Sequence, residues 1–224
     1  MQNLDDFILV NKPVGWTSFD VVKYYKIKLK VKKIGHGGTL DPLATGLLII
    51  AINENTKKLN KILGLNKEYE FEILFGLGTE TGDMEGKNIN QAKVVRIDIK
   101  KLEKTLEKLH GSIVLKVPNY SAVKVNGKKL YELARKGNSI KNNDLPTRVN
   151  TIYKLKLIKL YLIKNKQIGK LIVECSSGTY VRSLVEKIGE LMNIPTVAYN
   201  IKRTKIGDYD LNQAISPQLN KINN

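Results

Sequence analysis

Hydrophobic positions along the chain follow two rhythms that predict strands. The stretch EYEFEILF, residues 68–75, alternates polar and apolar residues, which predicts a strand with one buried face. The apolar positions on that face are Tyr69, Phe71, Ile73 and Phe75. The run LLIIAIN, residues 47–53, is continuously apolar and rich in β-branched residues, which predicts a strand buried on both faces. FILV at residues 7–10 predicts a short strand, and residues 152–175 predict a hairpin around KNKQIG.

Other segments carry helical spacing together with start and stop signals. A helix is predicted after the turn NKPVGWTS, capped by Thr17 or Ser18, and GKKLYELARKG predicts a second, stopped by Gly137. Asp98 is predicted to cap a helix that ends at Gly111. Its inward residues are Leu102, Leu106 and Leu109. YVRSLVEKIGELMN predicts a helix whose inward residues are Val181, Leu184, Val185, Ile188 and Leu191.

Strands and helices do not alternate as regular βαβ units. An α+β fold is therefore expected, with a mixed or largely antiparallel central sheet flanked by helices. The 224 residues, 42% of them hydrophobic, suffice for a real core, and the expectation is one catalytic domain over residues 1–224. No internal repeat is visible, and the chain closes on a polar tail, SPQLNKINN.

Charge changes this picture, because 38 Lys and Arg oppose 21 Asp and Glu and give a formal net charge of +17. Such an excess favours a polyanionic partner, with nucleic acid ahead of an acidic membrane surface. No apolar run reaches the roughly 20 residues of a membrane span, and MQNLDDFILV lacks the basic start of a signal peptide, so an intracellular, cytoplasmic protein is expected. Cys175 is the single cysteine, and His36 and His110 are far apart in sequence, so no metal site is expected.

The segment GHGGTLDPLATG, residues 35–46, carries the strongest candidate for chemistry. It matches no phosphate-loop pattern, and GLGTETG misses the GxGxxG spacing, so no nucleotide cofactor is expected. An Asp-Pro pair by itself is a common turn former. Here, however, glycines before Asp41 allow another molecule to come close, and the buried strand behind it would hold the carboxylate rigid, as a nucleophile requires.

Three further residues draw attention, each with a simpler alternative. Arg182 falls in the first turn of a predicted helix, where the helix dipole disfavours a cation unless an anion compensates, although it could be an exposed arginine. Tyr69 could be ordinary core or could stack on a base. His36 is either a turn residue or a wedge between bases, and the pattern does not choose between these.

Several separated motifs resemble, in order and spacing, the TruB family of bacterial tRNA pseudouridine synthases that act on the T arm. They are NKPVGWTS, GHGGTLDPLATGLL, KEYEF, YSAVKVNGKKLYELARKG, CSSGTYVRSL and IKRTKIGDY. The resemblance extends from about Leu4 to Ala214 and implies the pseudouridine synthase fold, isomerisation of uridine in tRNA by base flipping, and no cofactor.

The resemblance also implies residue roles. Asp41 matches the catalytic aspartate, which attacks the ribose or starts the equivalent elimination; Tyr69 matches the tyrosine that stacks on the flipped base, and Arg182 the arginine paired with the aspartate. His36 matches a histidine that opens the T loop, and Lys12 falls in the motif that supports the active-site loop. Residues that line the uracil pocket in the family are matched by Tyr180 and Ile201.

One departure from the family pattern is expected at the C-terminus. The family usually carries a small RNA-binding PUA domain there, and none is expected in this chain, whereas residues 118–146 match the family's mobile RNA-binding insertion. The expected partner is the T arm of tRNA, bound by a monomer without guide RNA or membrane. Two alternatives are a tRNA-folding chaperone that acts without the chemistry and a guide-RNA-dependent relative inside a ribonucleoprotein.

Overall fold

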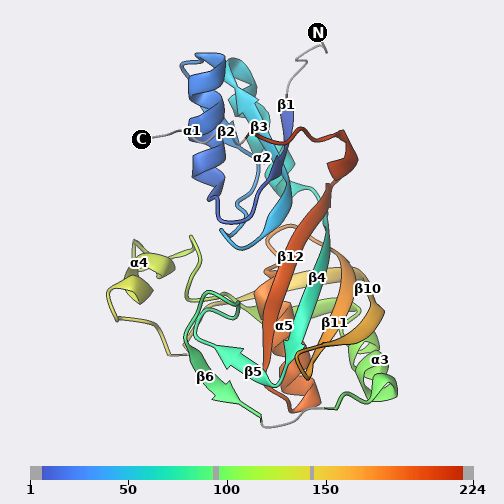
Figure 1. The fold of residues 1–224 in the computed structure, drawn as a ribbon. Helices are drawn as coiled ribbons and strands as arrows, with labels where there is room; N and C mark the ends of the chain where they lie inside the picture. The colour runs from blue at the N-terminus through green and yellow to red at the C-terminus, as the bar shows by residue number, and fades with distance from the viewer. Residues whose placement is uncertain (1–6, 93–95, 142–143, 219–224) are drawn as a thin grey trace. The chain divides into compact units, whose positions relative to one another are not determined.

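The computed structural model describes residues 7–92, 96–141 and 144–218 (Figure 1). The described residues form two compact units, one made of those up to Glu70 and from Ile201 onward, the other of Phe71–Asn200. The expectation of one catalytic domain over the whole chain stays a prediction. Part of the polar tail and residues 142–143 of the expected insertion lie outside the described residues.

The first unit is built around strand β3, and it is a mixed sheet because β1 pairs antiparallel with β3 while β12 pairs parallel with it. Strands β2 and β13 extend this sheet by antiparallel pairs with β3 and β12. The elements of this unit are β1 (Phe7–Lys12), α1 (Ser18–Leu29), β2 (Ile34–His36), β3 (Thr45–Ile52), η1 (Asn53–Lys58), α2 (Leu59–Gly64), β13 (Tyr209–Asp210) and η2 (Leu211–Gln213). Strands β4 (Lys67–Phe75) and β12 (Thr196–Ile206) each run through both units.

The second unit has the strand order β12-β4-β11-β10-β7, in which β10 is antiparallel to both of its neighbours. Helices α3 and α5 pack against each other and against β10 and β7, respectively (Figure 1). The remaining elements of this unit are β5 (Leu77–Thr79), β6 (Asn88–Gln91), α3 (Ile99–Glu107), β7 (Gly111–Lys116), β8 (Lys124–Val125), β9 (Lys128–Lys129), α4 (Leu130–Arg135), β10 (Thr147–Ile163), β11 (Lys166–Cys175) and α5 (Val181–Met192). The α+β class with a mixed sheet is thereby confirmed.

Local sequence signals fix several element boundaries as predicted. Thr17 caps α1 in a capping box, since its hydroxyl accepts from the Asp20 amide while the Asp20 carboxylate accepts from the Thr17 amide. Asp98 caps α3 by accepting from the amides of Lys100 and Lys101. On β4 the alternating aromatic and aliphatic positions are all buried, which confirms the predicted inward face.

Two helix predictions need correction. Helix α3 ends at Glu107, before Gly111, and Leu109 is buried just beyond it. Leu191 was predicted to face inward on α5, but it is 42% exposed, and Met192 is buried in its place. Met192 lies four residues after Ile188 and so continues the buried face of α5, whereas Leu191 is rotated about 100° away from Met192.

The β10–β11 hairpin is also tighter than the sequence suggested. Its strands run to Ile163 and from Lys166, which leaves Lys164 and Asn165 as the turn. Both turn residues have positive φ, 46° and 64°, as a two-residue type I′ hairpin requires. In the described part of the chain no helix has the length and apolar character needed to cross a membrane.

Candidate active site

Asp41 lies in the connection between β2 and β3, directly before a strand whose residues Leu47–Ala51 are fully buried. Antiparallel pairing with β3 fixes β2, with His36 opposite Ile50, and the Gly37 amide continues the ladder by donating to the Ile49 carbonyl at 2.8 Å. The Asp41 residue is half-buried, and its main-chain carbonyl accepts from the Ala44 amide at 3.1 Å. A short turn thus carries the carboxylate at the edge of the strand.

The residues on either side of Asp41 are tied to the first turn of α1 and to the preceding loop. Ser18 Oγ accepts from the Leu40 amide at 2.8 Å and lies 3.1 Å from the Leu40 carbonyl oxygen, to which it can donate. The Pro42 carbonyl accepts from the Gly15 amide at 2.9 Å and from Lys12 Nζ at 3.2 Å. The backbone on both sides of the carboxylate is therefore held by groups far away in sequence.

Lys12, predicted at the substrate site, is completely buried at the end of β1. Its ammonium donates to the carbonyls of Pro13 at 2.9 Å and Trp16 at 2.6 Å, in addition to that of Pro42. An ammonium has three N–H groups, and these carbonyls can accept all of them. The position of Lys12 thus supports the turn NKPVGWTS and the Asp41 loop from inside.

Arg203 on β12 is a site residue that the sequence reasoning missed. Its side chain is 1% exposed, and Nε donates to the Leu47 carbonyl at 2.8 Å. Nη2 donates to the Gly38 carbonyl at 3.1 Å and Nη1 to the Thr39 carbonyl at 3.5 Å. One guanidinium therefore spans the loop before Asp41 and the strand after it. The only sequence signal was an arginine within a strand, IKRTKI, among lysines that look equally basic.

Arg182 lies in the first turn of α5, as predicted, and it is 4% exposed, so the alternative of an exposed arginine is excluded. Nη1 donates to the Thr81 carbonyl at 2.8 Å and Nη2 to the Tyr120 carbonyl at 2.9 Å, while Nε lies 3.8 Å from Oδ2 of Asp83. Asp83 is itself buried, and its Oδ1 accepts from Thr81 Oγ1 at 2.5 Å and from the Glu85 amide at 3.1 Å.

The compensating anion expected beside Arg182 is thus present within its own unit as Asp83. Sequence reasoning did not single out Asp83, because the turn LGTETGDMEG offers three acidic residues, and only tertiary packing buries one of them beside the guanidinium. Whether Asp41 is also paired with Arg182 stays a prediction. The Thr81 and Tyr120 carbonyls that accept from Arg182 lie on loops, so the arginine links α5 to the turn after β5 and to the start of the expected insertion.

His36 ends β2 and is half-buried beside Arg203. Burial lowers its pKa below the ordinary 6.5, and the charge of Arg203 lowers the pKa further. Its Nδ1 is buried without a hydrogen-bond partner among the described residues. His36 is therefore neutral at pH 7, which suits a side chain that packs against an uncharged base better than one that pairs with a phosphate.

The other predicted site residues lie within β4 and β12 and at the start of α5. Tyr69 is buried on β4, and Ile201 is buried on β12, where its carbonyl accepts from Thr45 Oγ1 at 3.5 Å. Tyr180 is half-buried and precedes α5 directly as its N-cap residue. Asp41, His36, Lys12, Tyr69 and Ile201 belong to the first unit, whereas Arg182 and Tyr180 belong to the second.

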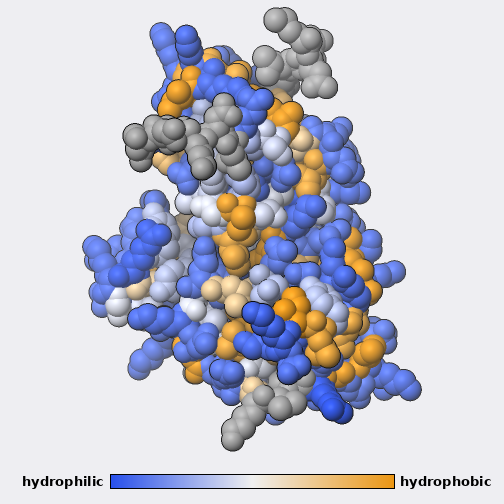
Figure 2. Space-filling model, in the orientation of Figure 1, coloured by the Kyte–Doolittle hydropathy of each residue, from blue (hydrophilic) through white to orange (hydrophobic). Residues whose placement is uncertain are grey.

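The expected insertion carries a small basic hairpin. Strands β8 and β9 pair Lys124 with Lys129 around a turn in which Asn126 and Gly127 have positive φ. Tyr131 at the start of α4 lies 5.4 Å from Lys129 Nζ, measured to the ring centroid, which is a cation–π distance. The α4 segment is hydrophilic on the face seen in Figure 2. Among the described residues no group of three or more His, Cys, Asp or Glu could hold a metal ion.

Residues 26–181 match the TruB family pseudouridylate synthase N-terminal domain. Over 215 residues the chain is 40% identical to the tRNA pseudouridine synthase B of Endomicrobium trichonymphae, which covers 95% of this chain and 90% of that protein. It is 38% identical to the protein of the same name from Ureaplasma urealyticum, over 94% of this chain and 90% of that one, and 38% identical to that of Aquifex aeolicus, over 95% and 72%.

Solved structures agree on the fold. A chain in the structure of an H/ACA RNP bound to a substrate RNA containing 2'-deoxyuridine superposes with a TM-score of 0.68 at 22% identity over 94% of this chain. The present chain spans about half the length of that one, 50%. At this identity the likeness concerns fold alone. Since the family match covers most of the chain and the named relatives are aligned over nearly all of it, this chain belongs to the TruB family of pseudouridylate synthases.

Proposed function

We propose that this chain isomerises uridine to pseudouridine in the T-arm loop of tRNA, with Asp41 as the nucleophile. The observation that carries the proposal is the alignment, at about 40% identity over 95% of the chain, with relatives named tRNA pseudouridine synthase B. The formal charge of +17 supports an RNA substrate, because such an excess attracts a phosphate backbone.

The reaction needs a rigid carboxylate next to an open approach, and the surroundings of Asp41 support both requirements. The backbone before and after it is held by Ser18, Lys12 and Arg203, so little motion is left to the loop. In the reaction the N-glycosidic bond of uridine breaks, the base turns, and a carbon–carbon bond forms between the ribose and base carbon C5. The C5 proton leaves and the freed ring nitrogen gains a proton, so no oxidant or reductant is consumed.

The remaining residues receive roles by proposal. Arg182 keeps the aspartate ionised, because a nearby cation favours the charged form of a carboxyl group. Tyr69 stacks on the flipped uracil and assists removal of the C5 proton, with Tyr180 and Ile201 lining the base pocket. A neutral His36 enters the opened T loop, and Lys12 supports the catalytic loop. The lysines of the β8–β9 hairpin contact phosphates, which position RNA without reading its sequence.

The enzyme is proposed to work as a monomer, without guide RNA, in the cytoplasm, where a tRNA substrate would be met. Incubation of the purified protein alone with a T-arm stem-loop transcript, followed by mapping of pseudouridine, tests this directly. Product at one loop uridine is expected. Binding of the transcript without any product would favour the chaperone alternative instead.

The matched variant is Asp41→Asn, which keeps size and hydrogen bonding but removes the nucleophilic charge. Turnover should fall by at least about 10³-fold while the Kd for tRNA changes by less than about threefold. Turnover that survives in Asp41→Asn would contradict the assignment of the nucleophile.

A further inference from the structure

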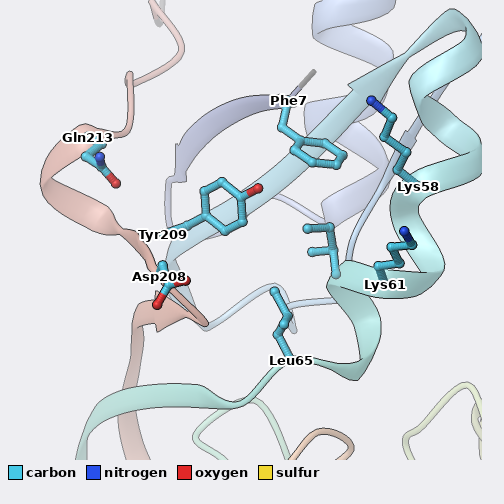
Figure 3. A pocket seen from close by; sticks show the side chains of 8 residues that line it. Phe7, Lys58, Lys61, Leu65, Asp208, Tyr209 and Gln213 are labelled. Carbon is cyan, nitrogen blue, oxygen red and sulfur yellow. The ribbon is translucent and has the colours of Figure 1, made fainter. Parts of the chain in front are cut away.

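A pocket in the first unit lies apart from the Asp41 loop and has no role in the proposed reaction. Its volume is about 510 Å³, within the range of small-ligand sites. It is lined by Phe7, Lys58, Lys61, Ile62, Leu65, Asp208, Tyr209 and Gln213. These residues come from β1, η1, α2 and the residue after it, the turn before β13, β13 itself and η2, so separate parts of the chain line one pocket (Figure 3).

The floor of the pocket is part of the core of this unit. Ile62 belongs to a buried cluster that also contains Leu47, Ile49 and Ile206, and Phe7, Leu65 and Tyr209 pack on that cluster while staying partly exposed. The Phe7 and Tyr209 rings meet edge to face, with centroids 6.0 Å apart. Two aromatic side chains thereby offer apolar surface to the pocket from a rigid base, because a ring pair on a close-packed core has little freedom to move.

Polar groups stand around this apolar floor. Lys58 and Lys61 lie on one side of the pocket, and Asp208 and Gln213 lie on the side of Tyr209 (Figure 3). Gln213 uses its side-chain oxygen to accept from the Asp210 amide at 3.0 Å, which leaves its NH₂ group as a donor. A ring for stacking, the Lys61 ammonium, and a donor with an acceptor at the far wall are together groups that recognise a nucleotide.

We infer that this pocket binds one unpaired nucleotide of the RNA, with the base against Tyr209 and the flanking phosphate at Lys61. This rests on the proposed function only in taking RNA as the partner; it adds a nucleotide site that is separate from the catalytic loop. The lysines suit any anion, and we favour RNA over an acidic peptide because an aromatic ring flanked by a donor and an acceptor fits the flat face and the polar edge of a base.

Helix α2, which lines the pocket, also packs against the loop that leads to Asp41. Ile62 packs against Gly37, where an added Cβ would come within 2.5 Å of the Ile62 side chain, and a Cβ added at Gly35 would lie 2.9 Å from the Leu59 side chain. Helix α2 is therefore packed tightly between the pocket and the glycine loop that leads to Asp41. An occupant of the pocket would therefore contact the helix that packs against that loop.

Photo-crosslinking tests the inference. A tRNA transcript containing 4-thiouridine is bound to the 224-residue chain, irradiated and digested, and the crosslinked peptides are identified by mass spectrometry. Crosslinks to a peptide containing Tyr209 or Lys61 are expected. If crosslinks form elsewhere but not to either peptide, the inference is overturned.

The tRNA affinities of matched variants test how much the pocket contributes to binding. Lys61→Glu should weaken tRNA binding about fivefold or more, whereas Lys57→Glu, an equal charge change at an exposed residue outside the pocket lining, should weaken it less than twofold. Tyr209→Ala should weaken binding about tenfold and Tyr209→Phe should leave it unchanged, since stacking needs the ring and not the hydroxyl. Thermal unfolding identifies any loss that comes from misfolding of Tyr209→Ala.

Equal affinities for Lys61→Glu and Lys57→Glu would overturn the inference. The two proposals fail in different ways. Absence of pseudouridine from wild-type reactions contradicts the proposed function, whereas normal pseudouridine formation without crosslinks at the pocket contradicts the nucleotide site alone.

Discussion

Two buried arginines, one in each unit, show how differently the same group can be used. Arg203 in the first unit forms hydrogen bonds, within the described part of the chain, only to the main-chain carbonyls of Leu47, Gly38 and Thr39. Arg182 in the second unit also donates to carbonyls, but the buried carboxylate of Asp83 lies 3.8 Å from its Nε.

The difference concerns what each charge does. The donors of Arg203 are matched to carbonyls that do not titrate, so its effect is to fix the backbone around Asp41. Arg182 lies in the first turn of α5, where the helix dipole disfavours a cation. The buried carboxylate of Asp83 compensates for this unfavourable position. An arginine held at an unfavourable position is a better candidate for a role in the reaction than one that only donates hydrogen bonds to main-chain carbonyls. We therefore expect Arg203 to control stability and Arg182 to control rate.

Arg203→Met should produce the largest effect on stability. It leaves the buried Leu47 carbonyl and the part-buried contacts to Gly38 and Thr39 without their donor. An unsatisfied buried group costs about 1–3 kcal/mol and a part-buried one costs less, so the free energy of unfolding should fall by about 3–4 kcal/mol. Urea denaturation measures this. Arg203→Lys should recover only part of the loss, because one ammonium cannot reach all three oxygens. If Arg203→Met were as stable as wild type, the hydrogen bonds of Arg203 would not stabilise the loop around Asp41.

Gly46→Ala probes the contact of β3 with the Arg203 backbone. An added Cβ would lie 2.3 Å from the Arg203 carbonyl oxygen, and Gly46 has φ +100°, so the free energy of unfolding should fall by about 3 kcal/mol. Gly111→Ala in the second unit is the control. Its φ is +83°, but nothing lies within 4 Å of the added Cβ, so only about 1 kcal/mol of backbone strain is expected. Similar losses for the two variants would show that the close approach is unimportant.

Arg182→Lys is expected to lower turnover more than stability, the opposite of what is predicted for the Arg203 variants. Turnover should fall about 100-fold, because an ammonium cannot reproduce the planar array of donors, while RNA affinity changes little. The loss of unfolding free energy should be smaller than for Arg203→Lys. Single-turnover kinetics and urea denaturation of the two lysine variants separate rate from stability, and near-normal turnover would remove Arg182 from the chemistry.

The smallest expected effect is the pH dependence contributed by His36. Its pKa is lowered in the folded protein, by burial first and then by Arg203, so the unfolded chain takes up the proton more readily. The stabilising contribution is complete above the unfolded pKa of about 6.5 and is lost as the pH falls toward the lowered folded pKa. His36→Asn should therefore reduce the slope of the free energy of unfolding against pH between about 5 and 7. If the slope is unchanged, the pH dependence in this range comes from other groups.

Much of the fold follows from neighbouring residues alone. The alternation of β4, the continuous apolar run of β3 and the caps at Thr17 and Asp98 depend on side chains a few positions apart, so the chain specifies them locally. The positions of Asp41 in a turn before a buried strand and of Arg182 in a first helical turn were predictable for the same reason.

What only the tertiary structure decided is which partners the buried charges have. Arg203 and Gly38 are 165 residues apart, and Asp83 was one of three acidic residues in its turn. Whether Leu191 or Met192 completes the buried face of α5 likewise depended on the surface against which the helix packs. Long side chains interact with segments that are far away in sequence and come together only when the chain packs. The local sequence pattern does not show which of these segments will be their partners.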